Sequence, residues 1–185
     1  PSTKKLITIY CSMIRKILVE PDPILRKKCQ SLEQVGDEER KLMNDMLETM
    51  YNAPGIGLAA VQIGILKKIV VIDVSKEKEK KKPLFLVNPK IIKRSKTTSV
   101  YEEGCLSLPG QFAEIERPAE CTLKYIDYYG KENELDASGL LATCIQHEVD
   151  HLNGILFIDY LSKLKKDMII KKLVKYKKDI ERVIV

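Results

Sequence analysis

The stretch His147-Glu148-Val149-Asp150-His151 contains both histidines of the chain. In a helix, a spacing of four residues places two imidazoles on one face, one turn apart, so that both can bind one metal ion. Glu148 would then lie close enough to exchange protons with a metal-bound water. This HExxH pattern is typical of hydrolysis by metal-activated water. The alternative is a surface helix that carries two ordinary histidines.

The residues around the motif predict a buried helix. Ser138-Gly139 precedes an apolar run, and Gly154 follows His151 closely as a helix-stop residue. One broad face of this helix of about four turns would carry Leu140, Thr143, Cys144, His147, Glu148 and His151. Other faces are apolar as well, which indicates burial. Buried histidines beside a glutamate require a partner, and a metal ion would supply one.

The composition indicates one globular domain. The chain has 185 residues, of which 44% are hydrophobic and 31% charged, enough for a compact domain with a real core. No apolar stretch is long enough to span a membrane, so we expect no membrane partner. The net charge is +6, and lysines are frequent near the C-terminus. They indicate either an acidic partner such as a ribonucleoprotein or simply a lysine-rich surface.

The cysteines indicate free thiols in a reducing compartment. Their number is odd, their spacing is wide, and no CxxC pair is present, which also disfavours a structural zinc ribbon.

We expect residues 1–12 to be an N-terminal extension and residues 13–185 to form a single catalytic domain, because Met13 opens a more domain-like sequence. The bacterial cytoplasm is the expected location, with an organelle of bacterial descent as the alternative.

The remaining elements predict an α+β domain with mostly antiparallel sheets packed around the central HExxH-bearing helix, and with a C-terminal helix. Apolar periodicity predicts helices over 37–52 and from 163 onward, and strands over 69–74, 84–93, 121–127, 131–135 and 155–158. Residues 21–26 read as an extended or turn segment. Residues 54–64 read as a small-residue loop that lets the backbone approach a ligand. Residues 101–110 read as a strand end that runs into a turn.

A catalytic metal usually takes three protein ligands, so a third ligand is needed. One common plan places a histidine six residues after the second one, but here that position is Phe157. Glu181, the only glutamate after Glu148, lies within the last five residues, where chains fray. Neither position is therefore a good third ligand.

Two cysteine thiols remain as candidates for the third ligand. Cys144 lies one turn before His147, but the rise of the helix carries it away from the point between the two imidazoles. A pocket wall suits it better. Cys105 follows Gly104 in an expected turn and can approach from elsewhere in the fold. We therefore predict Cys105 as the third ligand.

Three stretches together resemble the peptide deformylase family. They are residues 55–62 (GIGLAAVQ), 103–107 (EGCLS) and 146–152 (QHEVDHL), in the family's order and at its usual separation. The likeness extends from about Met13 to the C-terminus. It supports Cys105, His147 and His151 as the ligands. It also implies hydrolysis of the formyl group from N-formylmethionine at the start of new proteins.

The resemblance also implies roles for the remaining site residues. Glu148 would transfer protons, and the Gln62 amide and the Leu106 backbone N–H would stabilise the oxyanion. The methionine pocket and the groove for the peptide would be formed by Gly55, Ile56, Gly57, Glu103, Gly104, Leu140, Thr143 and Cys144. Thr143 is more polar than the aliphatic residue common at its position. Phe112 stands where many relatives carry arginine.

Ligand chemistry alone favours Zn²⁺. The resemblance implies Fe²⁺ in the cell, with Ni²⁺, Co²⁺ or Zn²⁺ as substitutes. The expected partners are N-formylmethionyl peptides and nascent chains, and the lysine-rich C-terminal helix is expected to contact the ribosome. Two alternatives remain open: a metallopeptidase of broader amide specificity, and a non-catalytic basic binding module.

Overall fold

The computed structural model describes residues 12–76 and 80–183, with side chains described as far as residue 180. The expected extension over residues 1–12 thus lies, apart from Ser12, outside the described residues. Within these ranges the elements are, in chain order, α1 (Asp37–Asn52), β1 (Gly57–Ala59), β2 (Ile69–Ile72), β3 (Leu84–Arg94), β4 (Thr98–Cys105), β5 (Leu108–Pro118), β6 (Glu120–Ile126), β7 (Glu132–Ser138), α2 (Gly139–Leu152) and α3 (Lys163–Val183). Short 3-10 helices occupy Pro23–Arg26, Ala60–Ile63 and Phe157–Tyr160.

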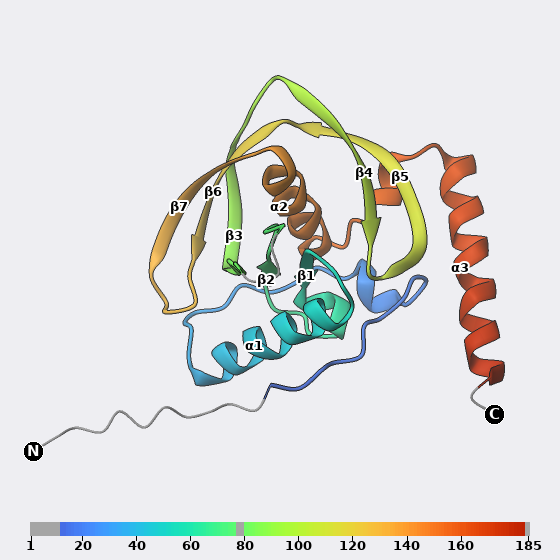
Figure 1. Cartoon of the computed structure of the whole chain (residues 1–185), viewed down its shortest axis with the longest axis horizontal. Helices are drawn as coiled ribbons and strands as arrows, with labels where there is room; N and C mark the ends of the chain where they lie inside the picture. Colours follow the sequence, from blue (N-terminus) through green and yellow to red (C-terminus); the bar gives the residue numbers. More distant parts are fainter. Residues whose placement is uncertain (1–11, 77–79, 184–185) are drawn as a thin grey trace, which may run out of the picture.

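The strands form two antiparallel sheets on either side of α2 (Figure 1). The larger sheet has the order β1-β2-β3-β6-β7, and the smaller one is the β4–β5 hairpin. This α+β arrangement around the HExxH-bearing helix confirms the predicted fold class. None of the helices in the described ranges is both long enough and apolar enough to cross a bilayer.

Strand β2 is apolar at every position because helices cover both of its faces. Ile69 and Val71 pack into the core cluster that includes α1, whereas Val70 and Ile72 pack into the cluster that includes α2. All of them are fully buried. A strand covered on both faces has no solvent side, so its sequence shows no polar alternation. This packing brings β1, which pairs with β2, directly against α2.

Helix α2 has the predicted bounds and burial. Its Ala142, Ile145 and Leu152 pack into the core of the larger sheet, and its opposite side faces the β4–β5 hairpin. Gly139 opens the helix with a φ of +58°, in the left-handed region that glycine adopts readily. Helix α3 packs against β5 and the Phe157–Tyr160 turn through its buried Leu173 (Figure 1).

Residues 54–64 are not all loop, because β1 and a 3-10 helix lie within them. Residues 21–26 contain a 3-10 turn, and β4 ends at Cys105 and runs into a turn at residues 106–107, as expected for both segments. The long strand β5, which begins at Leu108, was not expected. The sequence of β5 does not alternate between polar and apolar residues, so the strand could not be recognised from its pattern. The less exposed side of β5 carries Gln111, Ala113, Ile115 and Arg117, of which two are polar. Residues 155–158 form no strand; Leu156, Phe157 and Ile158 are apolar because a 3-10 turn buries them against β5 and α3.

Gly154, just after α2, provides a test of the fold. Its φ is +76°, and a Cβ there would contact the Arg26 carbonyl, lying 2.7 Å from the carbonyl carbon. We expect Gly154→Ala to lower the free energy of unfolding by more than the ~1–3 kcal/mol of backbone strain alone, measured by urea denaturation. Gly110→Ala is the control, because Gly110 has a φ of +70° but open space around it. Equal losses in the two variants would contradict the predicted contact.

Candidate metal centre and active site

Three predicted ligands converge in space although they come from different elements. Cys105 ends β4, whereas His147 and His151 lie one turn apart on α2. His151 Nε2 lies 3.2 Å from both Cys105 Sγ and His147 Nε2. Within the described ranges, this is the one group of three Cys, His, Asp or Glu ligand atoms that lie within 4.8 Å of one another. One thiolate and two imidazoles form a donor set that suits a borderline divalent metal ion.

The surroundings of His147 also fit a metal site. Its Nδ1 donates to Glu103 Oε2 over 2.8 Å, so Nε2 points at Cys105 and His151. Burial alone would raise the pKa of Glu103, but hydrogen bonds from His147 and Arg117 hold that pKa below its ordinary value. The ionised carboxylate therefore fixes the tautomer and orientation of the imidazole, as carboxylates behind metal-binding histidines do.

Arg117 anchors this carboxylate from β5. Its Nε and Nη2 donate to the two Glu103 oxygens over 2.5 and 3.1 Å, and its Nη1 donates to Asp150 Oδ2 over 2.8 Å. From the sequence, Glu103 was predicted only to line the substrate groove, and Arg117 and Asp150 were not predicted to belong to the site. One signal was present: Glu103 and Cys105 are two residues apart on a strand, so both point to one face.

Glu148 lies beside the ligands in a buried environment. Its side chain is 4% exposed, and Oε2 has no hydrogen-bond partner among the described residues. Burial raises the pKa of Glu148 to about 7, so this carboxyl can exchange a proton near neutral pH. Gly57 of β1 lies so close that a Cβ there would be 2.9 Å from Glu148 Cδ and 2.9 Å from Cys144 Sγ. Only glycine allows this approach of β1 to α2.

Gln62 and Leu106 approach the centre from the other side. The Gln62 Oε1 accepts from the Ala59 backbone N–H over 2.9 Å, while Nε2 donates to Ser107 Oγ over 3.1 Å and lies 3.5 Å from Cys105 Sγ. The amide is thus oriented with its donor end at the centre. Leu106 follows Cys105 in the turn between β4 and β5.

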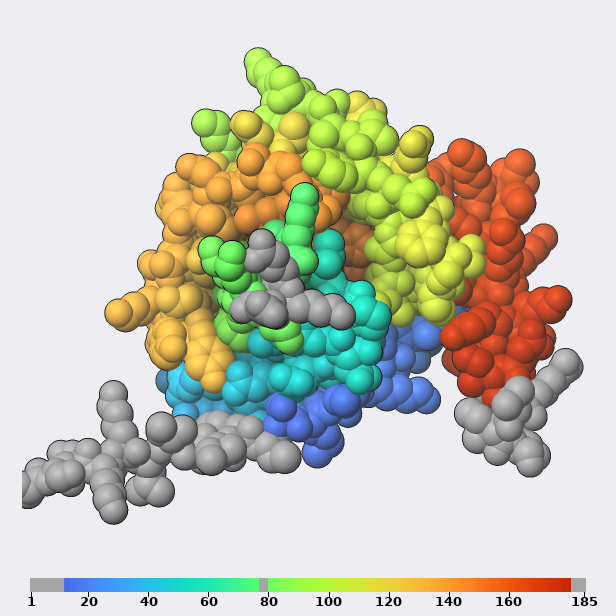
Figure 2. Space-filling view, viewed as in Figure 1, coloured from blue at the N-terminus to red at the C-terminus, as the bar shows by residue number. Residues whose placement is uncertain are grey.

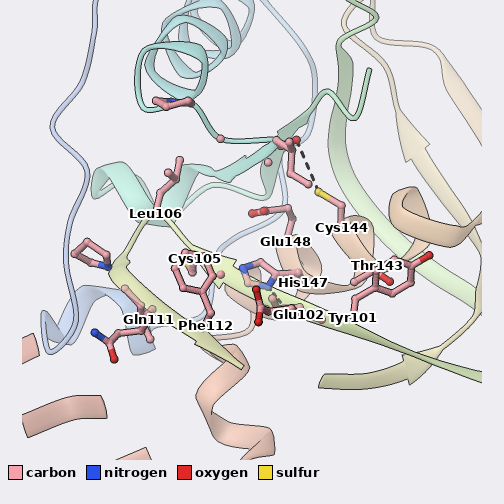
Figure 3. A pocket seen from close by; sticks show the side chains of 18 of the residues that line it. Tyr101, Glu102, Cys105, Leu106, Gln111, Phe112, Thr143, Cys144, His147 and Glu148 are labelled. Carbon is pink, nitrogen blue, oxygen red and sulfur yellow. Dashed lines mark hydrogen bonds and ion pairs between the residues drawn. The ribbon is translucent and has the colours of Figure 1, made fainter. Parts of the chain in front are cut away.

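A cavity of about 400 Å³ opens beside these groups. Figure 2 shows the hollow between the segment before β1 and the β4–β5 hairpin, and Figure 3 shows Glu148 and His147 facing it. Its lining includes every residue predicted to contact substrate, namely Gly55, Ile56, Gly57, Glu103, Gly104, Leu140, Thr143 and Cys144. Ile56 and Leu140 of this set are apolar and partly exposed, and the exposed ring of Phe112 lines the cavity as well. The roles of these residues in binding stay a prediction.

Two positions considered for the third ligand have other surroundings. Phe157 packs its ring on His147, with 6.2 Å between ring centroids. Burial, with added repulsion from Glu148, raises the pKa of the Cys144 thiol well above its ordinary value. Its Sγ lies 3.8 Å from the Ile56 carbonyl oxygen (Figure 3). A neutral thiol in this position suits a pocket wall.

Comparison with known proteins gives one consistent result. The sequence model of the family described as "Polypeptide deformylase" matches residues 14–167. Peptide deformylases of Pelagibacter ubique and Rhizobium meliloti are 63% and 56% identical, over 89% and 88% of this chain and 95% and 93% of theirs. Solved peptide deformylases of Ehrlichia chaffeensis and Legionella pneumophila superpose with TM-scores of 0.86 and 0.85 at 42% and 44% identity, covering 90% and 91% of this chain and 98% of each. The chain therefore belongs to the peptide deformylase family and is a metal-dependent hydrolase with deformylase activity.

Proposed function

We propose that the chain hydrolyses the formyl group of N-formylmethionyl peptides and nascent chains at the centre formed by Cys105, His147 and His151. The observation that carries this proposal is that the three ligand atoms converge beside a cavity whose wall also holds the buried carboxylate of Glu148. A divalent metal ion, when bound, lowers the pKa of water and polarises the formyl carbonyl. The other requirements of the reaction fall on side chains and backbone of this protein.

Glu148 serves as the proton carrier. It takes a proton from the attacking water and gives one to the amide nitrogen as the C–N bond breaks, releasing formate and a free amino terminus. The free Oε2 and the raised pKa of Glu148 support both steps. Negative charge develops on the formyl oxygen, where the Gln62 amide and the Leu106 backbone N–H donate hydrogen bonds. Loss of such a donor typically costs ~10²–10³ in rate.

The peptide lies in the groove between residues 55–57 and β4. Strand β4 pairs only with β5 in the described sheets, so its other edge is available for an added strand at Glu103 and Gly104. The apolar residues Ile56 and Leu140, with Cys144, surround the methionine side chain. Phe112 covers Gly104 closely, since a Cβ at Gly104 would lie 2.6 Å from the ring. Peptide residues farther along the groove then meet an aromatic face instead of a charge.

For the metal we propose Fe²⁺ in the cell, with Zn²⁺, Ni²⁺ or Co²⁺ able to replace it in purified protein. The mixed sulfur and nitrogen donor set accommodates all four ions. A thiolate is vulnerable to oxidation, so preparation without oxygen preserves the site. We also assign the chain to the bacterial cytoplasm, because the two curated relatives named above are bacterial and the cysteines described by the structure are free.

The lysine-rich face of α3 is the proposed ribosome contact. Leu173 is buried against the rest of the fold, which leaves Lys171, Lys172, Lys175 and Lys178 exposed. Such a basic surface attracts ribosomal RNA phosphates at long range. Contact there would place the active site near newly made N-termini.

The first test is formate release from formyl-Met-Ala-Ser by iron-loaded protein without oxygen. We expect rapid release that Glu148→Ala lacks, because the variant has no proton carrier; a loss of at least ~10²-fold in kcat follows from the usual size of acid–base catalysis. The unformylated peptide Met-Ala-Ser is the control. Its cleavage, without formate release from the first peptide, would favour the metallopeptidase of broader amide specificity.

The second test separates the two thiols. Cys105→Ser should lose tight iron binding, whereas Cys144→Ser should retain it, because only Cys105 Sγ lies with the histidine nitrogens. Metal content after anaerobic purification measures both. Equal loss in the two variants would show that the centre is misplaced.

The third test concerns α3. Replacing Lys171, Lys172, Lys175 and Lys178 by glutamate should weaken ribosome binding by more than about tenfold in a sedimentation assay. The introduced carboxylates would then repel the phosphates of the ribosomal RNA. The control replaces four exposed lysines outside α3, namely Lys90, Lys93, Lys96 and Lys124. Unchanged binding of the α3 variant would contradict the proposed contact.

A further inference from the structure

The aromatic ring of Phe112 reaches across the β4–β5 hairpin toward the peptide groove. Phe112 of β5 is directly opposite Gly104 of β4 and is 64% exposed. A Cβ at Gly104 would lie 2.6 Å and 2.7 Å from two carbon atoms of the ring, so the ring occupies the space that a side chain of Gly104 would take. Among the described strands, β4 pairs only with β5. The ring therefore lies beside any peptide that pairs with the other edge of β4.

Two glutamates continue the same face of the hairpin. Glu102 and Glu114 are directly opposite each other, two residues along each strand from Gly104 and Phe112, so all four positions share one face. Both glutamates are exposed, and neither forms an ion pair with a described residue. Like charges that face each other across two strands are unfavourable. A cation held beside the ring and the carboxylates would relieve this repulsion.

The cavity lining contains no positive charge that would repel such a cation. The lining residues that the structure describes include no lysine or arginine. Of the three glutamates among them, Glu103 is held by Arg117 and His147, and Glu148 is buried beside the metal ligands. Glu102 is the one exposed carboxylate of the described lining (Figure 3). It is therefore available to a substrate.

The alternation of side chains assigns this face to one residue of the substrate. Glu103 points from β4 to α2, where it bonds His147, and the proposed methionine pocket lies on that side as well. Successive side chains of an extended peptide point to opposite sides. When the methionine points to α2, the next side chain points to the face that carries Gly104, Phe112 and Glu102. The second residue of the peptide is thus the one that meets the ring and the carboxylate.

We propose that Phe112 and Glu102 are specificity-determining residues that favour lysine or arginine as the second residue of the substrate. The inference rests on the deformylase function proposed above. A cationic group over the ring gains a cation–π interaction, and the Glu102 carboxylate pairs with the same charge. Arginine fits best, because its planar guanidinium stacks on an aromatic face while its N–H groups bond a carboxylate. An acidic second residue meets like charge and is disfavoured.

The test compares kcat/KM for formyl-Met-Arg-Ser and formyl-Met-citrulline-Ser with metal-loaded protein. Citrulline has the length and the planar end group of arginine but no charge. We expect the wild type to favour arginine by roughly three- to tenfold, the range for one exposed cation–π contact together with one exposed ion pair. The preference should decline at high salt, because salt screens exposed charges.

Three variants locate the origin of this preference. Glu102→Gln keeps the shape but removes the charge, and Phe112→Leu keeps an apolar side chain but removes the ring. Each should lower the ratio of arginine to citrulline by about twofold or more. The matched control Glu132→Gln removes an exposed carboxylate from β7 and should keep the wild-type ratio. A general packing defect would lower kcat/KM for both peptides equally and leave the ratio unchanged.

Each outcome bears on a separate claim. A wild-type ratio of one or less would overturn the preference for a cation while leaving deformylation intact, whether or not the variants fold. Equal ratios in the wild type and in Glu102→Gln or Phe112→Leu would overturn the role of that residue. An equal decline in Glu132→Gln would assign the preference to overall charge and overturn the proposed contact. Absence of formate from these peptides and from formyl-Met-Ala-Ser would instead overturn the proposed function.

Discussion

The buried ion pair between Arg117 and Glu103 is the interaction on which the metal centre depends. Both side chains are at most 5% exposed, and burying each charge costs several kcal/mol unless the geometry is good. Here Arg117 donates twice to Glu103 and once to Asp150, while His147 completes the bonding of the carboxylate. The pair thereby joins β4, β5 and α2. It also sets the orientation of His147 before any metal binds.

The second constraint is the close approach of β1 to α2 at Gly57. Any side chain there would enter the space of Glu148 and Cys144. The approach places the larger sheet on one side of the cavity and the β4–β5 hairpin on the other, so the residues that line the cavity come from both sheets and the helix between them. The resulting burial raises the pKa of Glu148, which adapts an ordinary carboxyl to proton transfer near neutral pH.

The sequence predicted the local parts of this arrangement better than the long-range ones. The bounds of α2 follow from Gly139, Gly154 and the apolar periodicity between them, and the convergence of Cys105 with the histidines followed from the motif and the family resemblance. Strand β5 was missed because its inward side includes Gln111 and Arg117. The role of Arg117 in the site was missed for a related reason. A buried arginine is explained by partners distant in the sequence, and one sequence contains no signal for that pairing.

The two histidines, although equivalent in the motif, are held differently. His147 is oriented by Glu103 through Nδ1, whereas His151 Nδ1 has no hydrogen-bond partner among the described residues. His151 is 1% exposed, so packing and the contacts of its Nε2 with Cys105 and His147 determine its position. One ligand is therefore preorganised by a charged network and the other by the ligand cluster itself. Because carboxylate support raises ligand basicity, His147 would donate more strongly than His151 to a metal ion held by the two imidazoles.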